Sequence, residues 1–399
     1  SKIFFILIFA YNAGRLGKYM AGIKRIDIET FRGIRDLHLE NLSSINILTG
    51  DNNCGKTSIL EVLQSWSQPD NFNTWGSLLR RGNMRLRRLS LYEGFYDLFD
   101  INLEKKFIHY QIQEDNCTDV LLKATESIEE VSSARKDEIL GIKRYSQTIR
   151  EDENSGYQLY IEGLDDMPEP LSRLELEIQI NNNVVNTKNI YEEQLSIPYV
   201  IDTEKNSYYH NVVYISPSRH TEGSIYLNSV LNDPELYEEM LGILRDYDEG
   251  IISINYDMAN ELNPGSGRGV FKILSRSCKK ALPLNVYGDG MKKALLLMSA
   301  VMKARNGVLL LDEFETAIHT SAMDRTFRWI LRTCQKLNVQ VFLTSHSREA
   351  IDKVLKCDPE LQKDISVYTL YKDREQTLVR HLTGEQAVEA QDNMGLELR

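Results

Sequence analysis

Two short motifs, one near each end of the 399-residue chain, limit most strongly what this sequence can fold into. Residues 50–57 fit the pattern G-x-x-x-x-G-K-[ST], between an apolar run at 44–49 and a stretch with helical spacing at 57–64. Far along the chain, residues 308–313 form an apolar run that ends in two acidic residues. Further strand-like runs alternate with helical stretches around this second motif, which predicts a largely parallel α/β sheet.

The first motif has the composition of a phosphate-binding loop. Glycines let the backbone curl so that successive N–H groups point at one phosphate, and the start of the following helix adds positive partial charge. We expect Lys56 to reach the β- and γ-phosphates of a nucleotide and Thr57 to offer its hydroxyl to magnesium. An ordinary strand–turn–helix with a surface lysine is the alternative. The predicted nucleotide contacts are Gly50, Asn52, Asn53, Cys54, Gly55, Lys56, Thr57 and Ser58.

The second motif places Asp312 and Glu313 at the end of the apolar run 308–311. A carboxylate at the C-terminal end of a strand lies at the crevice where α/β sheets bind ligands. As consecutive residues at the end of a strand, Asp312 and Glu313 point to opposite sides, so one can face a metal and the other the attacking water. Phosphoryl transfer depends on such positioning and charge neutralisation. The two acidic residues could instead cap the next helix.

The composition argues against a protein that only coats nucleic acid, because the net charge is −11 and the pI about 5.3, whereas such proteins are usually basic. The cysteines at positions 54, 117, 278, 334 and 357 form no C-x-x-C pair. This predicts neither a zinc site nor a disulfide framework, and favours the cytoplasm. Residues 1–19 are interpreted as a non-core N-terminal extension, and no later segment is long and apolar enough to cross a membrane.

A further glycine-containing motif lies shortly before the carboxylates. Gly288, Asp289 and Gly290 open a helix, which makes them a possible anion site, although a plain turn is the commoner alternative. After the carboxylates, a predicted strand at 339–344 leads to His346. The order of these motifs along the chain is phosphate loop, glycine-rich helix start, carboxylates and histidine. This order resembles that of the ABC-type ATPases, including the SMC, RecF and OLD groups. The chain most resembles the OLD-like ABC ATPases of bacterial defence systems.

The resemblance implies a site for ATP and Mg²⁺ shared between two copies of the chain. In such ATPases the nucleotide lies between the phosphate loop of one subunit and the glycine turn of the other, so residues 288–290 would close on the γ-phosphate in trans. Asp312 would hold magnesium, with Thr57. Glu313 would deprotonate the attacking water, and His346 would contact the γ-phosphate. The glutamine that normally coordinates magnesium after the first helix is not identifiable in this sequence.

The same resemblance implies an α/β fold, namely an ABC-type P-loop ATPase head with a mixed or parallel core sheet, an antiparallel β subdomain and helical insertions. Glu315 and His319 would lie in the loop that contacts the dimer partner. The predicted divisions are the extension 1–19, the N-terminal half of the head at 20–100, a β-rich lobe at 101–210 with a helical insertion at 126–150, a connecting strand and helical insertion at 211–285, helical over 233–262, and the C-terminal half of the head at 286–399.

The biological role of ATP turnover is also inferred from the resemblance to these ATPases. OLD nucleases carry a nuclease domain after the ATPase, whereas a short stretch follows His346 here. We therefore expect an oligomeric sensor and scaffold that controls a separate effector, a nuclease or toxin, similar to the ATPases of the PARIS or Septu anti-phage systems. The alternative is a DNA-clamping or repair ATPase of RecF or SMC type. DNA contacts would then come from Arg80, Arg81, Arg85, Arg87 and Arg88, with Arg276, Lys279 and Lys280 as weaker candidates.

The arginine run itself has two other interpretations. Its members could form a solvated helix face, or they could pair with the abundant aspartates and glutamates of the chain.

Overall fold

The computed structural model describes residues 22–80, 89–140, 168–195, 208–217, 226–257, 270–317, 322–374 and 376–394. Several predictions fall outside these ranges and concern the extension 1–19, Arg81, Arg85, Arg87, Arg88 and His319. Among the residues that the structure describes, no helix combines the length and the apolar character needed to cross a membrane.

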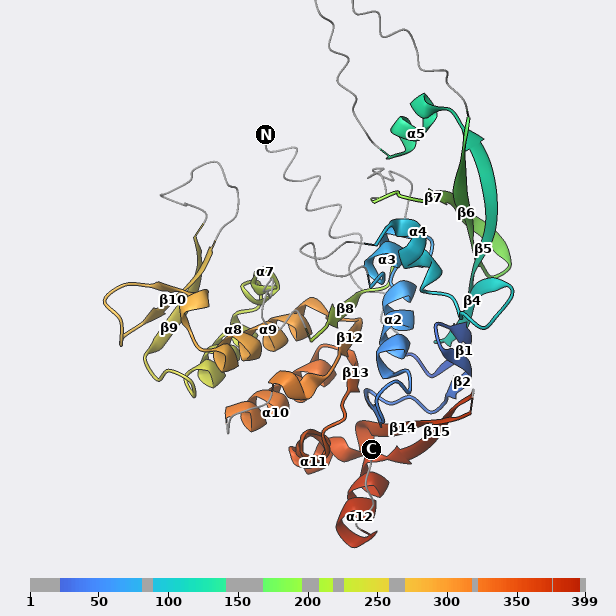
Figure 1. The fold of residues 1–399 in the computed structure, drawn as a ribbon. Helices are drawn as coiled ribbons and strands as arrows, with labels where there is room; N and C mark the ends of the chain where they lie inside the picture. The colour runs from blue at the N-terminus through green and yellow to red at the C-terminus, as the bar shows by residue number, and fades with distance from the viewer. Residues whose placement is uncertain are drawn as a thin grey trace, which may run out of the picture.

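A six-stranded, mostly parallel sheet forms the centre of the molecule, with the strand order β15-β14-β3-β13-β12-β8 (Figure 1). Strand β3 pairs in parallel with β13 and β14, and β12 pairs in parallel with β13 and β8, whereas β15 runs antiparallel to β14. The strands preceding the two sequence motifs, β3 and β12, are thus separated only by β13. The strands span Ile45–Gly50 (β3), Val212–Ile215 (β8), Val308–Leu311 (β12), Gln340–Thr344 (β13), Ile365–Asp373 (β14) and Gln376–Thr383 (β15).

Alternate residues of the central strands enter two different hydrophobic cores, one on each face of the sheet. In β12, Leu309 and Leu311 pack with residues of α8 to α11, whereas Val308 and Leu310 pack with residues of α2 and of a second sheet. All four side chains are fully buried, as expected of parallel strands that are covered on both faces. The helices of the first face span Pro234–Leu244 (α8), Asp289–Lys303 (α9), Ala322–Lys336 (α10) and Arg348–Lys356 (α11).

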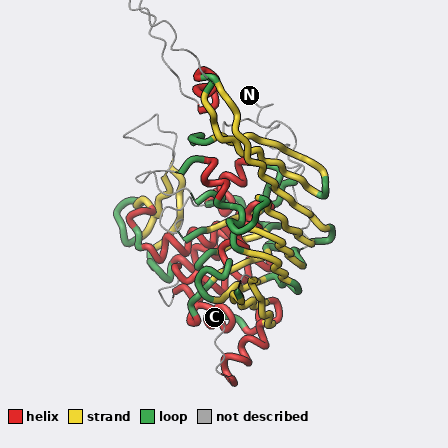
Figure 2. The backbone as a smooth tube through the Cα atoms, turned by 45° about the vertical axis from the view of Figure 1, so that its right-hand side comes forward, coloured by secondary structure: helices red, strands yellow, loops and turns green. Residues whose placement is uncertain are grey.

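The second sheet is antiparallel and has the order β2-β1-β4-β5-β6-β7. Helix α2 (Lys56–Trp66) lies between this sheet and the central one, because its apolar residues share one core with both. Figure 2 shows these strands along one side of the molecule, with most helices on the other. The strands span Arg25–Phe31 (β1), Ile34–Leu39 (β2), Lys106–Gln113 (β4), Cys117–Val131 (β5), Glu169–Ile180 (β6) and Asn183–Tyr191 (β7), and the nearby short helices span Phe72–Ser77 (α3), Leu91–Tyr96 (α4) and Ser133–Leu140 (α5).

A small antiparallel sheet, β11-β10-β9, projects beside α8 (Figure 1). Its strands span Ile251–Asp257 (β9), Val270–Ser275 (β10) and Leu282–Pro283 (β11), and the remaining helices are Leu227–Val230 (α7) and Gly384–Met394 (α12).

Two predicted helical insertions are partly wrong. Within 126–150, strand β5 continues to Val131 and pairs with β6 along that length, before α5 begins. Within 233–262, α8 ends at Leu244 and β9 follows. In both places the strand is paired along its backbone with a partner strand, β6 or β10. Ile128 of β5, for example, is 74% exposed.

The remaining predicted elements are confirmed in kind. The strands expected at 44–49, 308–311 and 339–344 correspond to β3, β12 and β13. The helix expected at 57–64 corresponds to α2, with ends that differ by a few residues. The predicted α/β class with a mixed core sheet and a separate antiparallel sheet is confirmed.

Candidate active site

The glycine loop leaves β3 and enters α2 through residues with left-handed backbone conformations. Gly50, Asn53 and Gly55 have φ angles of 128°, 64° and 100°, in the region that glycine tolerates best. A Cβ at Gly50 would lie 2.0 Å from the carbonyl oxygen of Leu370 in β14, so this position requires glycine. Gly55 is the N-cap of α2, and no side chain caps the helix. The first backbone N–H groups of α2 are therefore available to an anion.

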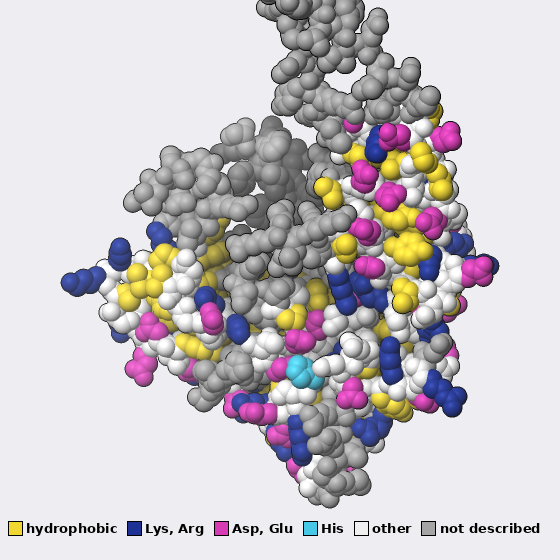
Figure 3. All heavy atoms as spheres, in the orientation of Figure 1, with side chains coloured by type: hydrophobic (Ala, Val, Ile, Leu, Met, Phe, Trp, Pro, Cys, Tyr) yellow, Lys and Arg dark blue, Asp and Glu magenta, His cyan; other side chains and the backbone are white. Residues whose placement is uncertain are grey.

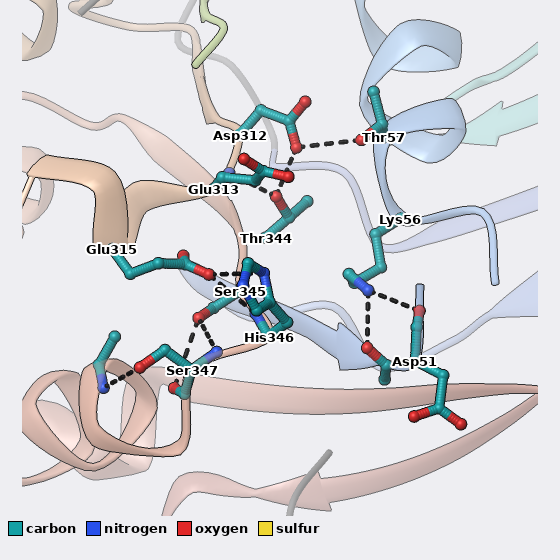
Figure 4. A network of polar contacts seen from close by, with 12 residues as sticks. Asp51, Lys56, Thr57, Asp312, Glu313, Glu315, Thr344, Ser345, His346 and Ser347 are labelled. Atoms are coloured by element: carbon teal, nitrogen blue, oxygen red, sulfur yellow. Dashed lines mark hydrogen bonds and ion pairs between the residues drawn. The ribbon is translucent and has the colours of Figure 1, made fainter. Parts of the chain in front are cut away.

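The predicted loop residues range from exposed to buried, with Gly55, Lys56 and Thr57 half-buried. Asn52 and Asn53 are exposed, whereas Cys54 and Ser58 are buried. Lys56 folds along the loop, where its Nζ donates hydrogen bonds to the carbonyl oxygens of Gly50 at 2.6 Å and of Asp51 at 2.8 Å (Figure 4). The ammonium group therefore lies over the loop that the sequence predicts to hold phosphates.

Asp312 is buried and accepts hydrogen bonds from hydroxyl groups of three different elements. Thr57 of α2 donates at 3.2 Å and Thr344 of β13 at 2.5 Å, both to Oδ1, and Tyr214 of β8 donates to Oδ2 at 3.1 Å. Burial raises the pKa of Tyr214, and the charge of Asp312 raises it further, so the phenol remains a donor. The structure thus brings together Thr57 and Asp312, the two predicted magnesium ligands, and adds two residues that the sequence analysis missed.

Glu313 lies beyond the end of β12, in a turn, and has a φ of 47°. The expectation that a continuing strand separates the two carboxylates is therefore wrong, because β12 ends at Leu311. Asp312 and Glu313 lie in the turn that follows this strand. The backbone N–H of Glu313 donates to the hydroxyl of Thr344 at 2.8 Å, and this same hydroxyl donates to Asp312. One threonine of β13 thus fixes both acidic residues.

His346 follows β13 and contacts Glu315. Glu315 Oε1 accepts the backbone N–H of His346 at 3.0 Å and lies 2.9 Å from Nδ1 of its ring. Figure 4 shows the imidazole between Glu315 and the side of the site that carries Lys56. Glu315 was expected in a loop that contacts a dimer partner, yet its carboxylate is engaged within its own chain.

These side chains meet at the carboxyl ends of β3, β12 and β13, the position where α/β sheets bind ligands. A family model described as "AAA domain, putative AbiEii toxin, Type IV TA system" matches residues 45–352. This span is well over half of the chain and runs from β3 into α11, so it contains every element of the site. The chain belongs to this AAA_21 family. It is an ATPase of that family.

The AAA_21 chain also resembles individual proteins. The "ATP/GTP phosphatase" of Helicobacter pylori is 22% identical, over 91% of this chain and 96% of the relative. An uncharacterized protein of Methanocaldococcus jannaschii is 30% identical, over 28% of this chain and 98% of the relative.

Two solved structures were found to be similar at low TM-scores. An SMC head bound to the C-winged helix domain of ScpA has a TM-score of 0.47 and 11% identity, over 92% of this chain and 99% of that one. The recombination mediator protein RecF has a TM-score of 0.45 and 14% identity, over 92% of this chain and 100% of that one.

The glycine turn at 288–290 of the AAA_21 chain forms the start of α9. Asp289 pairs with Lys292 at 2.7 Å, and Lys293 donates to the carbonyl oxygen of Thr316, just after the carboxylate turn. Within the part of the chain that the structure describes, no hydrogen bond or ion pair joins this turn to the phosphate loop. A Cβ at Gly288 would meet no atom within 4 Å, so the turn faces open space.

Arg80 is the member of the predicted arginine run that lies within the described ranges. Its guanidinium donates to Glu61 of α2, which also accepts a hydrogen bond from Arg32 at 2.9 Å. Arg32 further donates to the carbonyl oxygen of Leu78, which holds the segment before Arg80 against α2. Of the three interpretations of the run, pairing with an acidic residue describes Arg80.

Proposed function

We propose that this ATPase binds and hydrolyses ATP with Mg²⁺ between two copies of itself and uses the cycle to control a separate effector in anti-phage defence. The convergence of Lys56, Thr57, Asp312, Glu313 and His346 at one end of the central sheet carries the proposal. The name of the Helicobacter pylori relative, a phosphatase of ATP and GTP, supports the chemistry.

In this proposal the side chains act mainly by positioning and by neutralising charge. The N–H groups at the start of α2 and the ammonium of Lys56 bind the phosphates, and Lys56 exchanges its loop carbonyl partners for phosphate oxygens. Thr57 and Asp312 fit Mg²⁺, because both offer oxygen atoms beside the phosphate loop and this ion is often bound by one or two protein groups plus substrate phosphates. Magnesium would there neutralise charge on the β- and γ-phosphates.

Glu313 is the proposed general base. It lies in a left-handed turn next to Asp312 and is partly exposed. It would orient the attacking water and accept its proton, and His346 would contact the γ-phosphate. A general base contributes about 10²- to 10⁴-fold to a rate, which sets the size of the effect expected when Glu313 is replaced.

The Gly288–Gly290 turn is proposed to act in trans. Its open position and the lack of polar bonds to the phosphate loop within the described residues support a role toward a second copy. ATP bound to one phosphate loop would then join two molecules, and hydrolysis would separate them.

Control of an effector, a nuclease or toxin, is favoured over direct action on DNA. The net charge of −11 opposes general binding to a polyanion. Figure 3 shows Lys and Arg side chains interspersed with Asp and Glu on the visible face, without a continuous basic surface. The pairing of Arg80 with Glu61 gives one arginine of the run a partner within the chain. The family description names a putative toxin of a toxin–antitoxin system, which is consistent with a role in defence.

Three variants test the catalytic part of the proposal. Lys56→Ala should abolish ATP turnover, whereas Lys105→Ala, an exposed lysine before β4, should retain it. Glu313→Gln should bind ATP with near-normal affinity but turn over at least about 100-fold more slowly. Wild-type hydrolysis by the Lys56 variant would contradict the assignment of the phosphate loop.

The trans arrangement is tested by Gly288→Arg, which the open space around Gly288 should let fold normally. The matched control is Gly242→Arg on α8, where a side chain also meets no atom within 4 Å. Light scattering of Glu313→Gln with ATP and Mg²⁺ should report paired molecules, and the added Gly288→Arg change should leave monomers with bound ATP. Pairing that survives Gly288→Arg would refute this arrangement.

The proposed control of an effector by ATP binding and hydrolysis is tested with the native gene locus. Co-expression with the product of the adjacent gene should give a complex that is lost on phage infection, and Glu313→Gln should abolish protection in a plating assay. A salt-sensitive DNA gel shift that disappears in an Arg80/Arg81/Arg85 triple variant would instead support the DNA-clamp alternative.

A further inference from the structure

Glu315 makes two contacts with a single residue, His346. Its Oε1 atom accepts the backbone N–H of His346 at 3.0 Å and lies 2.9 Å from ring Nδ1. The Glu315 side chain is 13% exposed, whereas that of His346 is 53% exposed. A mostly buried carboxylate therefore holds a ring whose other edge is open.

This geometry determines which ring nitrogen of His346 carries hydrogen toward Glu315. An ionised carboxylate can only accept hydrogen bonds, so Nδ1 must be the donor. His346 makes no polar contact through Nε2 with any residue that the structure describes. Nδ1 is thus committed to Glu315, and Nε2 remains as the ring atom that can meet a ligand (Figure 4).

The position of Glu315 is itself fixed by its neighbours. It belongs to a short 3-10 helix, Phe314–Ala317, which starts directly after Glu313. Phe314 is fully buried in the core beside α9 and α10. Lys293 of α9 donates to the carbonyl oxygen of Thr316. The carboxylate that holds His346 is therefore anchored both to the core and to the helix that follows the Gly288–Gly290 turn.

The other carboxylate oxygen, Oε2, is buried and has no hydrogen-bond partner among the described residues. Leaving a buried polar atom without a partner is unfavourable and usually has a functional reason. Stability alone would favour an apolar residue, or a carboxylate with both oxygens paired. A buried carboxylate with one unpaired oxygen is more easily explained if Glu315 serves to orient His346.

We propose that Glu315 is a positioning residue of the ATPase, which fixes His346 in the Nδ1–H form and presents Nε2 toward the bound triphosphate. This inference rests on the proposed role of His346 and adds the group that orients it. Loss of such an orienting partner leaves binding largely intact but misplaces the group that acts on the reacting phosphate.

The form of the ring is measured by NMR on protein labelled with ¹⁵N-histidine, with the signal of His346 assigned from His346→Gln. In wild type the two-bond ¹⁵N–¹H pattern should show hydrogen on Nδ1. Glu315→Ala should shift the pattern toward the Nε2–H form, while Glu315→Gln, which keeps an acceptor oxygen, should retain it. Glu349→Ala is the matched control, because this glutamate lies close in sequence and is 82% exposed.

Kinetics supply the second readout. Glu315→Ala should lower kcat by about 10- to 100-fold with KM for ATP little changed, and Glu315→Gln should restore most of the rate. A His346 spectrum unchanged by Glu315→Ala would overturn the inference, and so would equal losses of kcat in the Ala and Gln variants. Normal turnover of His346→Gln would instead refute the proposed role of the histidine, whatever the spectrum shows.

Discussion

Replacement of Glu61 by glutamine is expected to destabilise the fold around the phosphate-loop helix. The Glu61 side chain is 7% exposed and accepts hydrogen bonds from Arg32 Nε at 2.9 Å and from Arg80 Nε at 3.1 Å. Burial lowers the pKa of Arg32, and the charge of Glu61 acts in the opposite direction. Glutamine would keep the shape but remove the negative charge and direct an NH₂ group at guanidinium donors.

The expected loss of unfolding free energy depends on how exposed each of the two arginines is. Removing one partner of a buried ion pair costs about 3–5 kcal/mol, and Arg32, 11% exposed, is close to that case. The Arg80 side chain is 56% exposed and can turn to water, so its own pair contributes under about 1 kcal/mol. Because Arg32 also keeps its bonds to backbone carbonyl oxygens, we expect a loss of about 2–4 kcal/mol for Glu61→Gln.

Urea unfolding followed by circular dichroism measures this difference as a change in midpoint at constant slope. Arg80→Ala is the matched control, since it preserves the buried contact between Arg32 and Glu61 and should cost less than about 1 kcal/mol. A loss below about 1 kcal/mol for Glu61→Gln, or equal losses for the two variants, would refute the reasoning.

Three other changes have definite expected outcomes. Gly50→Ala should prevent stable folding or lower the thermal midpoint by many degrees, because its Cβ would meet a β14 carbonyl at 2.0 Å, whereas Gly242→Ala, in open space on α8, should stabilise by about 0.5–1 kcal/mol. Tyr214→Phe removes one donor to Asp312 and should raise the Mg²⁺ concentration for half-maximal turnover by about 10-fold or more. A hydrogen bond to Asp27 in β1 raises the pKa of His38 above its ordinary value. The contribution of protonated His38 to the free energy of unfolding is therefore complete below pH 6.5 and is lost as the pH rises through the higher pKa of the folded state. In thermal scans at increasing pH, His38→Gln should reduce this loss of stability.

Local patterns predicted the parts of the site that depend on neighbours in sequence. The run of β3, the glycine loop and α2 are encoded in consecutive residues, as is the apolar strand before Asp312. The partners of Asp312 were not predictable in this way. Tyr214 stands 98 positions before it, and nothing in the short strand Val212–Ile215 marks the phenol as a partner for a distant carboxylate.

The errors have the same physical origin. The outer part of β5 exposes Ile128 and has no apolar face, and β9 was hidden in an acidic stretch that follows a helix. Each is a strand because another strand pairs with it, β6 or β10, and a partner strand is a tertiary property. The contact of Glu315 with His346 was not predicted either, because it depends on how β12 and β13 align.

The central sheet has a consequence for biosynthesis. All six residues of β3 are buried in the finished molecule, and the strands on either side of it, β13 and β14, come from the last sixth of the chain. At translation rates of roughly 5–20 residues per second, β3 leaves the ribosome about 15–60 s before those neighbours are made. An unpaired apolar strand that waits so long is prone to wrong pairing. Production of this ATPase in a foreign host should therefore improve when translation is accelerated or when chaperones that bind nascent chains are supplied.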